Sequence, residues 1–362
     1  MVKRTTKEKI DVLIRGAGPV GCTLALALQD SGLRVSVLDP FSQKKTSPFR
    51  PIALSYASRL ILERVGVWAA LRVTPIETVH VSQQGSFGRT RLEARDAGVP
   101  ALGYVTQYAD LVAALHSRIE SQNVKKAKEP VSALCEVHAE GSAPDAEEKR
   151  YSQDAIVGLV QFASGAGTTA FERFTPEGPL ALLPYSGRYA FVWSARPERA
   201  RWLAEIPEQS FLAELSAAAG SRIGTPVAVE ARSVQPLALR VRPARTGKRS
   251  VYIGNAAQTL HPVAGQGLNL GLRDAWDLAQ ILREARDPGD AATLARYAAA
   301  RRFDAQAIIR ITDVLAGAFL GSGRGRAARR LALTAALTAL DVFPVPRRFF
   351  ARRMIYGPSA LP

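Results

Sequence analysis

The 362-residue chain has few cysteines and no long apolar run. Its two cysteines, Cys22 and Cys135, cannot form a disulfide framework and lack zinc-type spacing, so we expect a reducing compartment and no bound metal. Residues 1–10 are charged and lead into a strand without the apolar core of a signal peptide. Because no apolar stretch reaches about eighteen residues, we predict no membrane span.

Acidic residues are scarce relative to basic ones. The chain carries 48 Lys and Arg against 32 Asp and Glu, a formal net charge of +16, which favours an anionic partner. Arginines are dense in the C-terminal third, beside apolar helical segments such as LALTAALTAL at 331–340, and no nucleic-acid-binding motif accompanies them. We therefore predict contact with an anionic membrane surface and no nucleic-acid partner. A solvated, arginine-rich helix face is the alternative.

The first glycine-rich segment lies between two predicted strands, at 10–15 and 33–39, and precedes a helix predicted over about 19–30. Gly16, Gly18 and Gly21 have the G-x-G-x-x-G spacing of a dinucleotide-binding turn. They permit a tight turn, close approach of a pyrophosphate and close helix–strand packing. The helix that Pro19 and Val20 open offers its positive end to the phosphates. Asp39 ends the second strand, where a carboxylate can bond ribose hydroxyls, so these six residues form a predicted dinucleotide site.

The middle of the chain is rich in predicted strands. Short strands are predicted over 76–93, 155–194 and 226–240, with helices near 196–219. Apolar residues 251–253 can then complete the parallel sheet of the first segment. A nucleotide-binding fold is therefore predicted to be interrupted by a β-rich region and resumed after it.

The second glycine-rich stretch is GNAAQTLHPVAGQGLNLGLRDAWDLA, residues 254–279. With the first three glycines and AFERFTPEGPLALLP at 170–184, it resembles the flavin-dependent aromatic hydroxylases. Within them it is most similar to the ubiquinone-biosynthesis monooxygenases and their 2-polyprenyl-6-methoxyphenol hydroxylase subgroup. The resemblance implies an α/β fold in which a Rossmann-like FAD-binding domain is interleaved with a β-rich substrate domain, followed by a helical C terminus. The implied limits are 1–75, 102–150 and 249–321 for the FAD-binding domain, 76–101 and 151–248 for the substrate domain, and 322–362 for a basic helical segment.

The resemblance also implies the chemistry. FAD is the cofactor, NAD(P)H visits as a co-substrate without a domain of its own, and O2 reacts with the reduced flavin. The flavin hydroperoxide then hydroxylates a polyprenylated phenol in ubiquinone biosynthesis. Because the tail of such a substrate lies in the bilayer, we expect a cytoplasmic protein held peripherally on the inner face of the cytoplasmic membrane, with other ubiquinone-biosynthesis proteins as further partners.

The remaining site residues follow from the same resemblance. Pro262 is the implied catalytic residue, shaping the face where oxygen and substrate meet. A helix beginning at the Gly265–Asn269 turn would present N–H groups to the flavin edge that gains negative charge on reduction. The implied cofactor contacts are Arg50, Gln107, Asn255, Gly265, Gln266, Gly267, Leu268 and Asn269.

Several of these residues have a plainer interpretation. Arg50 could be a surface charge, Gln107 a helix cap, and His261 either a proton donor or a turn histidine bonded to backbone. Four aromatic residues could line a prenyl pocket or form ordinary core, namely Phe162, Phe171, Phe174 and Trp193.

Two departures from the family pattern bear on function. Ala139-Glu140-Gly141 stands where the superfamily has Ala-Asp-Gly, and residues 123–137 are too few for the strands that relatives place over the adenosine side of FAD. The shortened segment motivates one alternative to a hydroxylase, a non-catalytic FAD-binding or scaffold subunit of a quinone-biosynthesis complex. A flavin-linked reductase of prenyl chains is a third possibility because it shares the nucleotide-binding fold, although the resemblance at HPVAGQGLNLGLRD favours hydroxylation.

Overall fold

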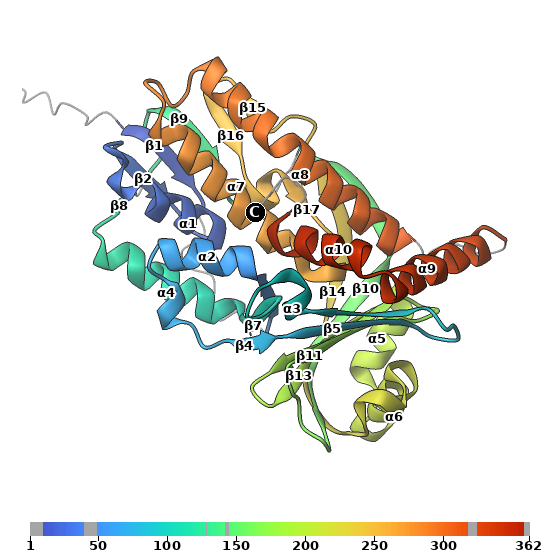
Figure 1. Ribbon diagram of the computed structural model, residues 1–362. Coiled ribbons are helices and arrows are strands. Elements are labelled where there is room, and N and C mark those ends of the chain that lie inside the picture. The colour runs from blue at the N-terminus through green and yellow to red at the C-terminus, as the bar shows by residue number, and fades with distance from the viewer. Residues whose placement is uncertain (1–9, 40–48, 128, 142–144, 318–323, 358–362) are drawn as a thin grey trace, which may run out of the picture.

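The computed structural model describes residues 10–39, 49–127, 129–141, 145–317 and 324–357 (Figure 1). Its first layer is a six-stranded sheet in the order β15-β16-β9-β1-β2-β8. All neighbours are parallel except the edge pair β15–β16. The strands are β1 Ile10–Arg15, β2 Val35–Leu38, β8 Lys125–Ala127, β9 Ala133–His138, β15 Thr246–Gly247 and β16 Ser250–Tyr252.

The main core lies on one face of this sheet. Apolar residues of β1, β2, β9 and β16 pack there against four helices. These helices are α1 Pro19–Ala27, α2 Tyr56–Arg64, α4 Tyr108–Ser121 and α7 Gln266–Arg283. Among the described residues, the apolar cluster on the other face is small and consists of Ile10, Leu13 and Leu38 with two alanines.

The second layer is an eight-stranded sheet in the order β17-β14-β10-β13-β12-β11-β5-β6. Its strands are β5 Thr78–Gln83, β6 Arg89–Glu93, β10 Glu147–Phe162, β11 Thr169–Phe174, β12 Pro179–Tyr185, β13 Arg188–Ala195, β14 Pro226–Val241 and β17 Gln258–Thr259. Helices α5 Pro197–Glu205 and α6 Glu208–Ala219 cover one face with an aromatic and aliphatic core. The opposite face meets α8 Ala291–Gly317 and the turn before α7.

A small sheet joins the two layers, formed by β3 Pro51–Ser55, β4 Thr74–Ile76 and β7 Gly103–Gln107. The C-terminal helices α9 Arg324–Val342 and α10 Pro344–Tyr356 lie across the second sheet and the short helix α3 Ala94–Ala97. Single 3-10 turns occur at Gln29–Ser31, Trp68–Ala70, Ser221–Ile223, Gly254–Ala256 and Val263–Gly265. Among the described residues, no helix combines the length and apolar character needed to cross a bilayer.

The predicted interruption and resumption of the first sheet is confirmed, because β16 pairs in parallel with β9 some 110 residues after it, with Val251 opposite Val137. Ser55 is the N-cap of α2, since its Oγ accepts a hydrogen bond from the Ser58 N–H at 3.2 Å. The domain limits stay a prediction. Parts of the segments that they assign, residues 1–9, 40–48, 142–144, 318–323 and 358–362, lie outside the described residues.

Candidate functional site

Two glycines of the first glycine turn, Gly16 and Gly21, have no room for a side chain. Gly16 has φ +104°, and a Cβ there would lie 2.5 Å from the Ala139 carbonyl oxygen. A Cβ on Gly21 would lie 2.0 Å from the Gly16 carbonyl oxygen. The turn can therefore pack this closely against helix α1 only because both residues are glycine. Gly18 is the N-cap of α1, Pro19 is buried behind it, and no side chain caps the helix. The N–H groups of α1 are therefore available to an anion.

Predicted contacts from three other elements surround this turn. Asp39 directly follows β2, whose Leu38 carbonyl accepts a hydrogen bond from the Gly16 N–H at 2.8 Å. The Arg50 guanidinium is exposed and lies 4.7 Å from the centre of the Tyr108 ring. Gln107 is the N-cap residue of α4 but makes no capping hydrogen bond, so the simple helix-cap interpretation does not hold for its side chain. A Cβ on Gly18 would lie 3.9 Å from the Tyr108 hydroxyl, which places this group beside the phosphate-binding turn.

The second glycine turn begins helix α7. Gly265 is its N-cap with φ +58° in the left-handed region, and no side chain caps this helix either. A Cβ on Gly267 would meet nothing within 4 Å, so the backbone is open on that side. Leu268 is half-buried against the main core. The first turn of α7 therefore offers N–H groups and a flat approach to a planar ring.

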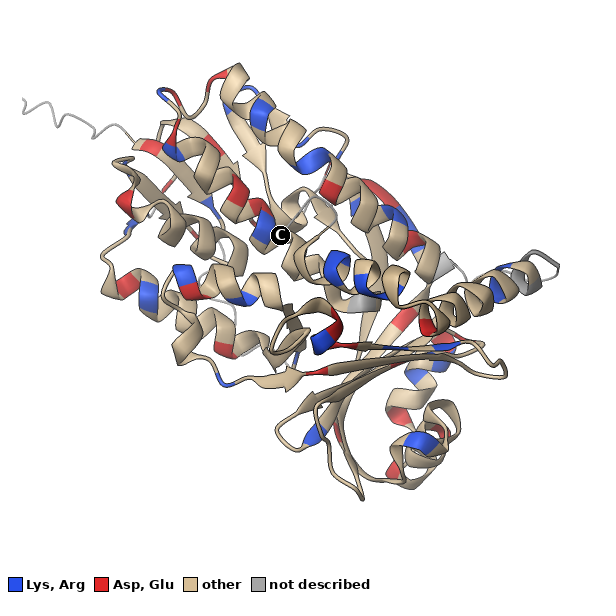
Figure 2. Ribbon diagram, in the orientation of Figure 1, with Lys and Arg blue, Asp and Glu red and all other residues tan. Residues whose placement is uncertain are grey.

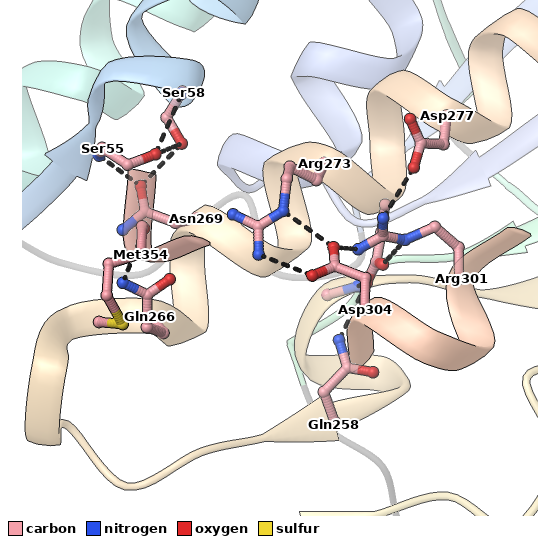
Figure 3. A network of polar contacts seen from close by, with 12 residues as sticks. Ser55, Ser58, Gln258, Gln266, Asn269, Arg273, Asp277, Arg301, Asp304 and Met354 are labelled. Carbon is pink, nitrogen blue, oxygen red and sulfur yellow. Dashed lines mark hydrogen bonds and ion pairs between the residues drawn. The ribbon is translucent and has the colours of Figure 1, made fainter. Parts of the chain in front are cut away.

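The Asn269 side chain fastens this turn to the chain around β3 (Figure 3). Its Oδ1 accepts hydrogen bonds from the Ser55 N–H at 2.8 Å and the Ser58 hydroxyl at 2.7 Å. Its Nδ2 donates to the carbonyls of Ala53 at 2.9 Å and Gly265 at 2.8 Å. The carboxamide is thus fully used within the protein, and any contact of Asn269 with a cofactor falls to its backbone.

Asn255 differs in this respect. It lies in the 3-10 turn after β16, half-buried, and its carboxamide makes no hydrogen bond within the part of the chain that the structure describes. Gln266 is buried and donates from Nε2 to the Met354 carbonyl at 3.5 Å. Val20 packs where a Cβ on Gly254 or Gly271 would go, so the two glycine-rich segments meet at its side chain.

A buried ionic network, which was not predicted from the sequence, anchors the second glycine-rich segment to the helix that follows it (Figure 3). Asp274 accepts hydrogen bonds from the Gly254 N–H at 3.2 Å, Gln258 Nε2 at 2.9 Å and Arg301 Nε at 2.8 Å. Arg301 also pairs with Asp304 at 2.6 Å. Burial alone would raise the pKa of Asp274, but the neighbouring guanidinium of Arg301 leaves it below the ordinary value. In the sequence, this network was indicated only by the Arg273-Asp274 pair inside an otherwise apolar helical motif.

A small pocket lies between the second sheet and the turn before α7. It is open to solvent, and its empty volume with that solvent space included is about 170 Å³; its lining includes Pro262, the predicted catalytic residue. Glu172 on β11 also borders it, and burial raises the pKa of this carboxyl to about 7. The adjacent His261 is buried and its Nδ1 accepts a hydrogen bond from the Val263 N–H at 3.1 Å, which agrees with a turn histidine. Burial lowers its pKa to about 4.

The four candidate pocket aromatics separate by sheet face. Phe162 and Trp193 belong to the core beneath α5 and α6, and Phe171 packs against that core. Phe174 lies on the opposite face, in a cluster with Val263 of the pocket turn. Core is therefore the better interpretation for the first three.

The shortened segment contributes β8 and most of β9 to the first sheet. Apart from residue 128, which is not described, α4 leads to β8 at the sheet edge and then directly to β9. Two polar contacts lie at the end of β9: Arg15 of β1 forms an ion pair with Glu136, and His138 Nδ1 is hydrogen-bonded to Glu140 at 3.1 Å. The sheet face bearing Ile10, Leu13 and Leu38 receives no further strand from this segment within the described residues.

The fold and the two uncapped helix N-termini beside glycine turns define a protein that binds a dinucleotide through backbone groups. Comparison with known proteins gives the cofactor and the family. The model of the FAD binding domain family matches residues 9–113 and 130–312 and leaves out residues 114–129, which include the first part of the shortened segment. Ubiquinone hydroxylase UbiL of Rhodospirillum rubrum is 32% identical over 350 residues, covering 85% of this chain and 81% of that protein.

Two further relatives align over similar lengths. An uncharacterized protein of Synechocystis sp., slr1300, is 30% identical over 352 residues, covering 86% of this chain and 85% of that protein. The 3-demethoxyubiquinol 3-hydroxylase of Escherichia coli is 29% identical over 327 residues, covering 79% and 83%. The chain belongs to the family of FAD-binding monooxygenases that includes the ubiquinone hydroxylases.

Solved structures share the fold. Pseudomonas putida p-nitrophenol 4-monooxygenase PnpA superposes with a TM-score of 0.75 at 17% identity, covering 98% of this chain and all of that one. PqsL of Pseudomonas aeruginosa, a probable FAD-dependent monooxygenase, gives 0.72 at 23% identity, covering 91% and 100%. The predicted aromatic-hydroxylase-like fold, the FAD cofactor and the class of flavin-dependent monooxygenase are confirmed.

Proposed function

We propose that the protein hydroxylates the ring of a polyprenylated phenol in ubiquinone biosynthesis, with NAD(P)H and O2 as co-substrates. The names of two relatives, a ubiquinone hydroxylase and a demethoxyubiquinol hydroxylase, support this pathway and substrate class. Membership of the 2-polyprenyl-6-methoxyphenol hydroxylase subgroup is the finer proposal, and it rests on the motif at 254–274. The observation that carries the reaction type is the pocket that Pro262 shares with the second sheet, beside the open turn of α7.

FAD fits the residues present. The α1 N-terminus would hold the pyrophosphate through the turn of Gly16, Gly18 and Gly21, with Pro19 and Val20 opening the helix and Asp39 on the ribose. The Asn255 carboxamide has no protein partner within the described chain, and Gln107 has no capping bond, so both are suited to phosphate or ribityl oxygens. Arg50 would add positive charge at the same side.

When bound, the flavin would supply the redox chemistry, because it is reduced by the nicotinamide and then activates oxygen. The protein's contribution near the ring would come from the Gly265–Asn269 turn. Its bare N–H groups and the positive end of α7 stabilise negative charge at the pyrimidine edge of the ring. Gln266 and Leu268 would hold the backbone of this turn in place through their buried and half-buried side chains, respectively. Gly267 would leave the backbone accessible to the ring, and Pro262 would form part of the pocket wall that faces the substrate. Apart from Glu172 and Ser194, the pocket lining is apolar.

The outward face of α10 supports a peripheral place on an anionic membrane. Val345 and Phe349 are 77% and 60% exposed there, and Arg348 and Arg352 are exposed one turn apart. Neither arginine has an ion pair with any residue that the structure describes, whereas Arg347, on a different side, pairs with Asp96 at 3.1 Å. Exposed apolar side chains among unpaired cations suit an anionic lipid surface better than water. Figure 2 shows basic residues, in blue, along α10.

Vesicle sedimentation tests this surface. Arg348→Glu/Arg352→Glu should weaken binding to vesicles containing phosphatidylserine by at least about 30-fold, because each arginine near such a surface contributes about 1 kcal/mol. Arg222→Glu/Arg286→Glu makes the same change in net charge on other elements and should bind as the unmodified protein does. Equal loss in both double variants would show that net charge alone, rather than this face, draws the protein to lipid.

The proposed reaction is tested with FAD-loaded protein, NAD(P)H and a short-chain prenylphenol under isotopically labelled O2. Phenol-stimulated NAD(P)H oxidation with one labelled oxygen in the ring supports the hydroxylase. The shortened segment favours one competing function, a non-catalytic FAD-binding or scaffold subunit. A folded protein that binds no FAD, or binds it without phenol-stimulated oxidation, would support that alternative instead.

A further inference from the structure

One carboxyl in the pocket has no role in holding the protein together. Glu172 sits in the middle of β11, opposite Val81 of β5 and Ala181 of β12, in an interior position of the second sheet. Its side chain is half-buried and makes no hydrogen bond or ion pair with any residue of the described chain. Glu177, five residues on, is paired with Arg199 at 3.4 Å. In a chain with 48 basic residues, an inward-facing carboxyl left without a cation is unusual.

Apart from Ser194, the described residues around Glu172 are apolar. Because paired residues on neighbouring strands share a face, Glu172 points to the same side as its partners in β5, β12 and β13. Among the described residues, no charged group shifts the pKa of Glu172, and burial is the cause that raises it. The groups that face it are Val81, Ala181, Val192, Ser194, Pro262 and Val263.

Resting on the function proposed above, we propose that Glu172 is the base that accepts the hydroxyl proton of the bound phenol. The phenol O–H would donate to the Glu172 carboxylate, leaving a phenolate and a neutral carboxylic acid. The phenolate is the more electron-rich ring, and an electron-rich ring is what hydroxylation requires. When the hydroxylated ring becomes aromatic again, the carboxylic acid returns the proton to the phenolic oxygen, so proton and charge balance over the cycle.

Position and acidity both suit this role. Pro262 and Glu172 line the same pocket, so a ring that lies against the turn before α7 meets the carboxyl from β11. A phenol has a pKa of about 10 and an ordinary glutamic acid about 4.3. The pKa of about 7 at Glu172 lies nearer to that of the phenol, which favours general base catalysis near neutral pH.

The test compares Glu172→Gln with the protein as it is and with Glu177→Gln as the matched control. All three are loaded with FAD, and flavin content, melting temperature and the rate of flavin reduction by NAD(P)H are measured first. The substrates are 2-prenylphenol with one isoprene unit and ring-fluorinated analogues whose hydroxyl is more acidic. We expect Glu172→Gln to lower kcat for ring hydroxylation by about 10² to 10⁴, with flavin reduction unchanged.

Two readouts separate a base from a structural residue. The unmodified enzyme should gain activity as pH rises through about 7, and Glu172→Gln should lack that step. The fluorinated phenols should recover part of the lost rate in Glu172→Gln, because they ionise with less help. Glu172→Asp should retain the pH step, which covers the case of a misfolded Gln variant. An unchanged kcat and pH profile in Glu172→Gln would overturn the assignment, whereas absence of ring hydroxylation in the unmodified enzyme would overturn the proposed function itself.

Discussion

Replacing Asn269 by alanine should destabilise the protein without touching the cofactor directly. The carboxamide is 2% exposed and makes four hydrogen bonds, to Ser55, Ser58, Ala53 and Gly265. At about 1 kcal/mol for each net hydrogen bond, their loss costs about 4 kcal/mol. For 362 residues unfolding with an entropy of about 2.1 cal/mol/K each, this lowers the melting temperature by about 5 °C.

The assay is thermal unfolding with and without added FAD. Asn255→Ala is the matched control, because this asparagine belongs to the same sequence motif but lacks a protein partner within the described chain. It should leave the melting temperature of the FAD-free protein within about 1 °C, since substitutions away from buried contacts usually change stability by less than about 0.5 kcal/mol. Its loss should instead weaken FAD binding.

Asn269→Asp adds a pH signature. The aspartate can still accept from Ser55 and Ser58, but its second oxygen would face two carbonyl oxygens and must carry a proton to bond either one. Its folded pKa is therefore raised above the unfolded value of about 4. Stability from the protonated form is complete below pH about 4 and is lost as pH rises, so the deficit against the unmodified protein should grow from pH 4 to pH 7. A melting temperature of Asn269→Ala within about 1 °C of the original would refute the reasoning.

Three other outcomes follow from the same geometry. Gly21→Ala should eliminate bound flavin, because its Cβ would lie 2.0 Å from the Gly16 oxygen. The Cβ of Gly267→Ala would meet nothing within 4 Å, so this variant should fold normally. Visible absorbance measures the bound flavin, and circular dichroism measures folding. Arg301→Met leaves buried Asp274 without its main cation and should cost about 3 to 5 kcal/mol in denaturant unfolding. The pKa of Asp274 is held below its ordinary 3.8, so its stabilisation is present above that pH and lost as pH falls through the folded value. Acid unfolding of Arg301→Met should accordingly begin at a higher pH.

The sequence allowed the local elements and their order to be predicted well. The strand–turn–helix at 10–27 follows from glycine spacing and apolar periodicity, which depend on neighbours in the chain. Even the return of residues 250–252 to the first sheet could be predicted, because a short apolar strand before a glycine-rich turn repeats the logic of the first segment.

Long-range pairing of polar side chains could not be predicted. Asn269 was assigned to the flavin, yet its side chain bonds residues more than 200 positions earlier. The cation that neutralises Asp274 comes from Arg301 on the next helix, and nothing in either local pattern specifies the other. Glu172 lies in a strand of ordinary amphipathic character, and only the sheet register places it beside the turn of Pro262.

The way in which the first sheet is assembled has a consequence for how the protein is made. Strands β1 and β2 leave the ribosome first, but β16 follows some 200 residues later. Gln266, in the first turn of α7, contacts Met354 near residue 362. Because these contacts need the late part of the sequence, we expect the cofactor site to be completed, and FAD to bind, after most of the chain has been synthesised. Exposed apolar surface and unpaired strand edges make partly folded chains prone to aggregation, which applies to β1 and β2 until then. We therefore expect a fusion or truncation at the C terminus to lower FAD content as well as to affect the proposed membrane contact.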